Sequence, residues 1–141
     1  PAINQRIYNA FTENRLRLTG YAISEKLVVN HSHRFAYISL TKNELDRFQH
    51  QNGDTEGLVN YALSMKDVIA AVLMTEKGGR IRLSFRSKGD FAVNRIANEY
   101  FEGGGHKNAA GGNSFLSMEE TINKLNKIIP KYANELLAVQ L

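Results

Sequence analysis

A glycine-rich stretch with a single histidine is the part of the sequence best suited to hold a ligand. Residues 101–112 read FEGGGHKNAAGG, in which five of the twelve residues are glycine. Backbone without side chains can approach a ligand closely and direct N–H groups at an anion. His106 adds a hydrogen-bond donor that can be neutral or charged near pH 7. The composition fits a ligand loop and a tight structural turn alike, and its spacing matches neither a Walker loop nor a dinucleotide-binding fingerprint.

A strand of alternating character precedes this stretch. Residues 80–88 read RIRLSFRSK, so the apolar side chains would face a core and the arginines would face away from it. We expect Arg80 and Arg82 to belong to a solvated strand face. Arg86 and Ser87 end the strand, which is where ligand sites gather in open α/β sheets. A guanidinium there can bind phosphate through two parallel hydrogen bonds.

The other polar residues offer no catalytic machinery. The chain has no cysteine, so no thiolate can act as a nucleophile or a zinc ligand. His31 and His33 fall in an expected hairpin turn without a nearby carboxylate, and His50 falls in a polar loop. We therefore expect no metal site in this chain. The acidic residues are scattered over capping and turn positions, so the sequence predicts an anion-binding unit without catalytic residues.

The order of the expected elements indicates an α/β fold. Apolar residues at helical spacing predict a helix over 3–18 that stops at Gly20. The patterns further predict strands over 25–31, 34–40, 68–76 and 81–87. They predict helices over 42–48 and 55–65, and a third helix that begins after an Asp90 cap. A last helix should begin at a Ser117–Glu120 capping box and bend at Pro130. We expect a single domain in which helices flank a mixed β-sheet, with an N-terminal linker helix.

Length and composition fit one soluble globular domain. The chain has 141 residues, of which 43% are hydrophobic and 23% charged. It has no signal-peptide layout and no apolar run near the roughly 20 residues of a membrane span, so we expect a cytoplasmic protein without membrane contact. The net charge of +4 allows an anionic ligand but is mild for a long nucleic acid. Because the chain begins with Pro1, we expect it to be a piece of a longer protein.

Three segments together resemble one protein family. The glycine–histidine segment GGGHKNAAGG (103–112) resembles the motif of the DHH-associated domain, which follows the catalytic half of DHH-family phosphoesterases. SFRSKGDFAVNRIA (84–97) is similar to the arginine strand and helix of that domain, and DTEGLVNYALSMKDV (54–68) is similar to an upstream segment. The segments occur in the family's order. Within the family, the chain most resembles the NrnA-like group of bifunctional oligoribonucleases and 3′-phosphoadenosine-5′-phosphate phosphatases.

The resemblance implies that catalysis and substrate binding lie in different domains. In such enzymes an N-terminal domain carries an Asp-His-His motif and holds two manganese ions, which activate water against a phosphoester. This chain has no Asp-His-His motif. We therefore expect residues 1–20 to be a linker helix from a missing catalytic domain, and residues 21–141 to be the substrate-binding domain. We expect this chain alone to bind no cofactor and to be inactive, and the sequence leaves a homodimer open.

The resemblance also assigns substrate contacts, position by position. Arg86 and Ser87 would contact the phosphate or base of the substrate, and Gly104, Gly105 and His106 would complete the phosphate pocket. Thr55 and Glu56 would line the cleft, with Lys88, Lys107, Asn108 and Asn113 as further contacts.

Several substrates are consistent with this assignment. The expected substrates of the parent enzyme are short oligoribonucleotides and 3′,5′-bisphosphate nucleotides. Within the same enzyme class, cyclic or linear dinucleotides, polyphosphate, and single-stranded DNA as in RecJ-type exonucleases stay open. In another class, the chain would be a non-catalytic tRNA-binding or assembly module like the related domain of alanyl-tRNA synthetase. His106 and the arginine strand argue against that class.

Overall fold

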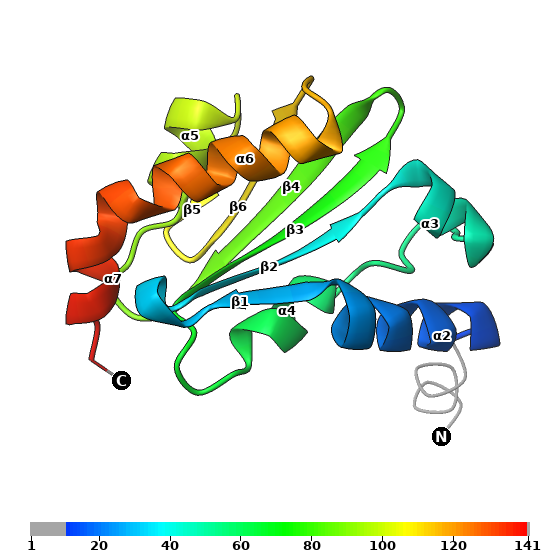
Figure 1. The fold of residues 1–141 in the computed structure, drawn as a ribbon, viewed down its shortest axis with the longest axis horizontal. Coiled ribbons are helices and arrows are strands. Elements are labelled where there is room, and N and C mark those ends of the chain that lie inside the picture. Colours follow the sequence, from blue (N-terminus) through cyan, green and yellow to red (C-terminus); the bar gives the residue numbers. More distant parts are fainter. Residues whose placement is uncertain (1–10, 141) are drawn as a thin grey trace.

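A six-stranded mixed sheet forms the centre of the protein in the computed structural model, which describes residues 11–140 (Figure 1). The strands are β1 (Leu27–Asn30), β2 (Phe35–Leu40), β3 (Ala70–Lys77), β4 (Arg80–Ser87), β5 (Gly104–His106) and β6 (Ala109–Ser114). Their order across the sheet is β1-β2-β3-β4-β6-β5. β2 and β3 are parallel, and the other neighbours are antiparallel. The expected α/β fold with a mixed sheet is confirmed.

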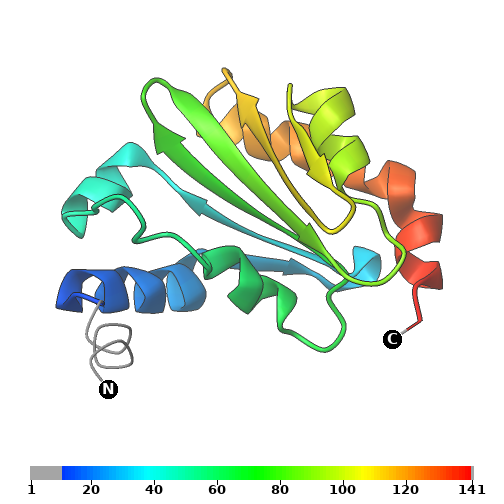
Figure 2. The same cartoon turned by 180° about the vertical axis from the view of Figure 1, so that it is seen from behind.

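Helices cover both faces of the sheet (Figures 1 and 2). On one side lie α2 (Glu13–Tyr21), a π-helical turn (Ala22–Lys26), α3 (Lys42–Arg47) and α4 (Leu58–Leu63). On the other side lie α5 (Asn94–Tyr100), α6 (Met118–Ile128), a 3-10 turn (Ile129–Tyr132) and α7 (Ala133–Ala138), while a second 3-10 turn (His31–His33) joins β1 to β2. We call the first side the α4 face and the second side the α6 face.

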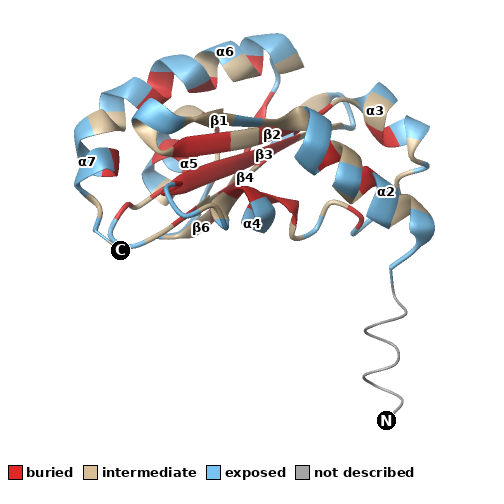
Figure 3. Cartoon of the chain, turned by 60° about the horizontal axis from the view of Figure 1, so that its bottom comes forward, coloured by how far each residue is buried: buried red, intermediate tan, exposed pale blue. Residues whose placement is uncertain are grey.

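The alternation of each strand divides the core into two apolar clusters. Figure 3 shows the central strands as the most continuously buried part of the chain. On the α6 face, residues of β3 and β4 pack against three helices, with Val72, Leu83, Phe85, Ile96, Leu125 and Leu136 among the buried residues. On the α4 face, the buried residues include Leu18, Ala36, Ile38, Val59 and Leu73. Removing these side chains from water is the main stabilisation of both layers.

Helix boundaries that carry a capping box or a proline in the sequence lie at the expected positions. Thr41 accepts from the Glu44 N–H while the Glu44 carboxylate accepts from the Thr41 N–H, which is the expected capping box of α3. Ser117 and Glu120 form the same arrangement at the start of α6. The bend at Pro130 is present as the 3-10 turn between α6 and α7.

The expected stop of the first helix at Gly20 is wrong. Within the described residues, α2 begins after its cap Thr12 and continues through Gly20 to Tyr21. Leu18 and Ala22 flank the glycine, and both are fully buried in the α4-face cluster. Their packing stabilises helical backbone at Gly20 by more than the glycine disfavours it. Residues 3–10 of the expected helix lie outside the described residues.

Two other expected helices begin later in the structure. The expected helix over 55–65 starts only after Gly57, which has a positive φ of 85°. Asp90 caps no helix, because α5 begins at Asn94 and the Asp90 carboxylate pairs with Lys107 at 3.0 Å. The Val93 N–H donates to the Lys107 carbonyl at 2.9 Å, which holds this segment against the β5–β6 turn instead of in a helix. These contacts join residues distant in sequence.

The carboxylate of Glu44 connects α3 to the N-terminal helical layer. It accepts hydrogen bonds from the Thr41 N–H and the Tyr21 hydroxyl, and Lys26 Nζ lies 3.0 Å from it. Burial raises the pKa of the Glu44 carboxyl, but these hydrogen bonds and the Lys26 charge outweigh burial and lower the pKa to about 2. A carboxyl whose folded pKa is lowered contributes stability above its unfolded pKa of 4.5. That contribution disappears as the pH falls through about 2.

We therefore expect Glu44→Gln to lower the free energy of unfolding at pH 7 by an amount on the order of 3 kcal/mol. The difference from the wild type should shrink as the pH falls from about 4.5 to about 2. Urea denaturation across this range measures it. Asp46→Asn is the control, because the Asp46–Lys42 pair is exposed. If the difference in unfolding free energy between Glu44→Gln and the wild type stays constant down to the lowest pH, the lowered pKa of Glu44 is contradicted.

Candidate anion-binding site

The glycine-rich stretch forms the edge of the sheet. β5 pairs with β6, and β6 pairs with β4, so residues opposite one another point to the same face. Arg86 lies opposite Ala109, which lies opposite His106. Because neighbouring strands are about 4.8 Å apart, the Cα atoms of Arg86 and His106 are roughly 10 Å apart. Both side chains therefore rise from the α4 face of the sheet.

Residues opposite one another on β4, β6 and β5 form rows across the sheet, and the row next to that of Arg86 and His106 is nearly free of side chains. Ser84 lies opposite Gly111, which lies opposite Gly104. Gly104 and His106 are exposed, whereas α4 lies over β2, β3 and β4. The result is a floor of bare backbone at Gly104 and Gly111 on the α4 face. Arg86 and His106 lie in the row beside this floor, with Ala109 between them. Such a floor lets a ligand come close to the backbone of the edge strand β5.

Three of the five glycines in this stretch are required by the fold itself. A Cβ on Gly103 would lie 1.9 Å from the Gly111 carbonyl oxygen. A Cβ on Gly112 would lie 2.9 Å from Phe101. Gly105 has a φ of 145°, and its Cβ would lie 2.7 Å from backbone atoms of β6. Close backbone approach therefore explains these three glycines.

The two glycines of the floor have no such requirement. A Cβ on Gly104 would meet no atom within 4 Å. A Cβ on Gly111 would make only an ordinary contact, 3.6 Å from the Leu83 carbonyl oxygen. Neither residue has a positive φ. The interpretation as a tight structural turn thus leaves unexplained the two glycines that face the open side.

A hollow of about 410 Å³ adjoins this floor over β4. Its opposite wall is the segment 50–57 and the first turn of α4. Basic side chains line its sheet side, namely Lys77, Arg80, Arg82 and Arg86. Glu56 is the one carboxylate among the described lining residues. The volume lies in the range of small-molecule sites, and the charge suits an anion.

The structure brings together most of the residues that the sequence selected. Thr55, Glu56 and Arg86 line the hollow. Gly104 lies on the adjoining floor and His106 beside it, and Gly105 lies between them with the position of a Cβ directed at β6. The segment 50–57, β4 and β5 therefore contribute residues to the hollow and to the floor beside it.

Lys88 lies at the far end of β4, beyond this hollow. Its ammonium group donates to the Met65 carbonyl at 2.9 Å, after the end of α4. Burial lowers the pKa of Lys88, and the nearby Arg34 charge lowers it further. The ammonium is therefore held by a contact within the protein.

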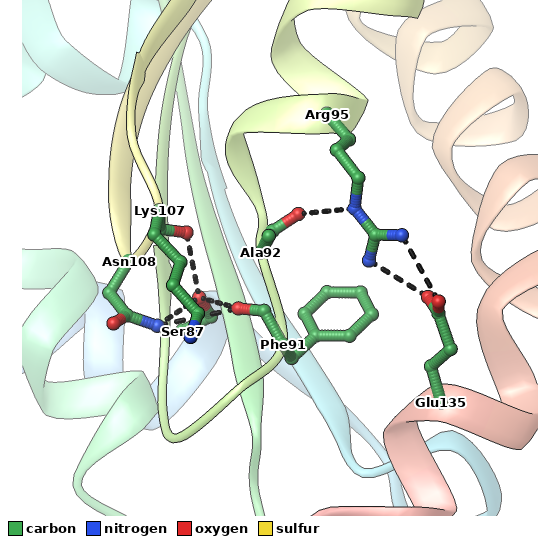
Figure 4. A network of polar contacts seen from close by, with 7 residues as sticks. All are labelled: Ser87, Phe91, Ala92, Arg95, Lys107, Asn108 and Glu135. Carbon is green, nitrogen blue, oxygen red and sulfur yellow. Dashed lines mark hydrogen bonds and ion pairs between the residues drawn. The ribbon is translucent and has the colours of Figure 1, made fainter.

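Ser87 and Asn108 belong to a polar network on the other side of the strand (Figure 4). Ser87 is buried, and its hydroxyl donates to the Phe91 carbonyl at 2.7 Å. The Asn108 side-chain amide donates to the Ser87 oxygen at 2.9 Å. This network ties the end of β4 to the β5–β6 turn and to the segment before α5. Figure 4 also shows Arg95 of α5 bound to Glu135 of α7 through two hydrogen bonds of 3.1 and 2.8 Å.

We expect Ser87→Ala to act on stability. The substitution leaves the Asn108 amide and the Phe91 carbonyl short of one partner, so the free energy of unfolding should fall by about 1–2 kcal/mol. Affinity for a phosphorylated ligand should change less than about twofold, since the hydroxyl points away from the floor. Denaturant unfolding and a binding titration on the same sample measure both. Full stability with lost binding would instead make Ser87 a ligand contact.

The sequence analysis did not predict that Lys77, Arg80 and Arg82 line the hollow. It placed the two arginines on a solvated strand face, and Arg82 is indeed exposed. The alternation of β4 already put both on the face of Arg86. What the sequence did not show is that the segment 50–57 stands opposite them and makes the face concave.

Neither a metal centre nor a membrane span is visible in the described range. Residues 11–140 contain no group of three or more His, Asp or Glu side chains that could hold a metal ion. No helix in that range is long and apolar enough to cross a membrane.

Comparison with known proteins gives a family match and two informative structural neighbours. The DHHA1 domain family matches residues 34–135. An exopolyphosphatase-related protein from Bacteroides fragilis is 41% identical, with a TM-score of 0.90 over 96% of this chain and 39% of its own. The pGpG-specific phosphodiesterase PggH from Vibrio cholerae is 14% identical, with a TM-score of 0.62 over 93% of this chain and 42% of its own, and shares the fold. No curated protein matches the chain.

The match spans the features that build the site. It begins in the turn before β2 and ends in α7, so it includes the segment 50–57, the arginine strand β4 and the glycine hairpin. The chain spans less than half the length of either structural neighbour. On this match, the chain belongs to the DHHA1 domain family.

Proposed function

We propose that this domain is the substrate-binding part of a DHH-family phosphoesterase and that it binds the terminal phosphate of a nucleotide substrate. The observation that carries the proposal is that Arg86 and His106 lie in one cross-strand row, separated by Ala109, directly beside the glycine floor on the same face of the sheet. Backbone N–H groups, a guanidinium and an imidazole are suitable donors for a phosphate oxygen. The family match and the exopolyphosphatase-related neighbour support the phosphoesterase class.

The chemical step would belong to another domain of the parent enzyme. The described residues contain no cluster that fits a metal ion, so the two manganese ions implied by the family resemblance would be held by an N-terminal domain. Residues 1–20 would then lead from that domain into this one. This domain would position the substrate, and by itself it would be inactive. We place the parent enzyme in the cytoplasm as part of the same proposal.

The proposed substrates are short oligoribonucleotides and 3′,5′-bisphosphate nucleotides. A terminal phosphate carries up to two charges, and a compact cluster of one guanidinium, one imidazole and backbone donors is sufficient to bind it. The hollow beside the floor leaves space for the rest of a nucleotide. Cyclic dinucleotides lack a terminal phosphate and should bind more weakly to such a cluster.

A ligand panel tests the proposal. The chain is titrated with a 5′-phosphorylated dinucleotide, the same dinucleotide without its phosphate, a cyclic dinucleotide, inorganic tripolyphosphate and tRNA. We expect the phosphorylated dinucleotide to bind at least about tenfold more tightly than its dephosphorylated form. Stronger binding of the cyclic dinucleotide or of tripolyphosphate would instead indicate that this ligand is the substrate of the parent enzyme. Salt-dependent tRNA binding without preference for a terminal phosphate would favour the non-catalytic tRNA module.

A further inference from the structure

The basic residues of the hollow form a row that continues from the phosphate floor along β4. Arg80, Arg82, Ser84 and Arg86 alternate onto the α4 face. At about 3.3 Å per residue, the Cα atoms of Arg80 and Arg82 are roughly 6.6 Å apart, and those of Arg82 and Arg86 roughly 13 Å apart. The row from Arg86 to Arg80 therefore spans roughly 20 Å, which is longer than one terminal phosphate requires.

No carboxylate of a neighbouring strand compensates this row. Arg80 lies opposite Lys77, and like charges opposite each other destabilise a sheet. Arg82 lies opposite Thr75 on one side and Asn113 on the other. Arg86 has only alanines opposite it. Among the described residues, none of the three arginines forms an ion pair.

The neighbourhood of Arg82 contains an acceptor without a partner. The Asn113 side-chain oxygen is buried and has no hydrogen-bond partner among the described residues. A buried polar atom of this kind costs free energy unless a donor reaches it. Arg82 lies directly across the strand pair, and an anion that orders this guanidinium would also position a donor beside Asn113. Both observations indicate a site that is completed by a ligand.

The wall of the hollow also has an apolar part. Leu45, Val59 and Leu73 contribute to its lining and are 4%, 3% and 5% exposed. Bare inorganic phosphate chains gain nothing from apolar atoms, whereas a sugar or a base buries its own apolar surface against them. The combination of spaced cations and an apolar wall therefore fits nucleotides better than inorganic polyphosphate.

We propose that Lys77, Arg80 and Arg82, together with the segment 50–57, form a second nucleotide subsite. This inference rests on the proposed function, because the first subsite is the Arg86–His106 floor. A short single strand would place its terminal phosphate on the floor and run along β4 toward the β3–β4 turn. Phosphates further along the strand would lie near Arg82 and Arg80, and its sugars or bases would face Val59 and Leu73. The natural ligand is then a strand of several nucleotides.

The test measures how affinity depends on ligand length. Fluorescence or NMR titrations use 5′-phosphorylated oligoribonucleotides of one to four nucleotides, with the wild type, the double variant Arg80→Gln/Arg82→Gln, and Arg86→Gln. For the wild type, affinity should rise about tenfold or more from one to three nucleotides. The double variant should lose most of this rise and bind the mononucleotide within about twofold of the wild type. For the tetranucleotide, the slope of log affinity against log salt concentration should be smaller by about 1.4 in the double variant, which is 0.7 for each of two lost phosphate contacts to a single strand.

A charge-matched control separates the subsite from a general effect of net charge. Lys127→Gln/Lys131→Gln removes two exposed positive charges from α6 and the turn after it, on the other side of the sheet, and should leave the length dependence unchanged. If this control and the arginine variant lose affinity equally, or if the arginine variant keeps the full rise, the second subsite does not exist. Tripolyphosphate that binds as tightly as the trinucleotide and depends equally on Arg80 and Arg82 would overturn the nucleotide assignment. Mononucleotide binding that Arg86→Gln leaves intact would instead refute the proposed function, independently of the length dependence.

Discussion

Gly103→Ala is expected to lower the free energy of unfolding by about 3 kcal/mol or more, because the new methyl group would overlap a backbone atom. The Cβ would lie 1.9 Å from the Gly111 carbonyl oxygen and 2.6 Å from the Gly112 Cα. Relief requires β5 and β6 to separate or the chain before β5 to move away from the sheet. Urea denaturation and the near-ultraviolet circular dichroism spectrum measure the loss. A variant as stable as the wild type would show that this close approach does not exist in solution.

Gly104→Ala, one residue further, is the matched substitution with the opposite expectation. Its Cβ would point into open space, so stability should stay within about 0.5 kcal/mol of the wild type. Affinity for a phosphorylated nucleotide should nevertheless fall about tenfold or more, because the methyl group occupies the floor on which the phosphate is proposed to lie. A stable variant that binds normally would show that the floor is not part of the ligand site.

Replacing Arg86 or His106 by Ala should have the largest effect on binding. Each side chain is proposed to give a charge-assisted hydrogen bond to phosphate, so each substitution should weaken binding by about 1.5–3 kcal/mol, or roughly ten- to a hundredfold. The melting temperature should change little, because His106 is exposed and the Arg86 side chain bonds within the described residues only to the Phe85 carbonyl. Thermal unfolding and titration with a phosphorylated dinucleotide measure both quantities.

The control for these two variants is Lys127→Ala, which removes one exposed positive charge from α6 on the other side of the sheet. It should bind like the wild type. The double variant Arg86→Ala/His106→Ala gives a further check, because two groups on one phosphate are coupled and their effects should not add fully. A large loss of stability with unchanged affinity would show that Arg86 and His106 are structural.

Much of the fold could be predicted from local patterns. The alternation of 80–88 predicts both the strand and the face on which each side chain lies, and β4 confirms it. The nearly all-apolar segment over 68–76 predicts a strand buried on both faces, which is β3. Both capping boxes depend on residues three apart in the chain, so they are present in the structure as expected. The fold class follows from these elements.

The predicted helix and loop boundaries were wrong where contacts between distant residues outweigh the local conformational preference of the chain. Gly20 fails to end α2 because Leu18 and Ala22 are buried in the core on either side of it. The glycine stretch is a sheet edge instead of a loop because β6 pairs with β4, a strand far earlier in the chain. Local propensity is weak compared with packing and with strand pairing.

The sequence by itself selected Arg86 and His106 as a candidate anion-binding pair, through the residue types and their order around these two positions. Only the tertiary structure decided which neighbours share their face. It places Ser87 in a buried network, puts Gly104 and Gly111 on an open floor, and sets Arg80 and Arg82 against the segment 50–57. The physical reason is that residue type and alternation are local properties of the chain. A concave site instead arises where strand register and a packed loop bring separate segments together.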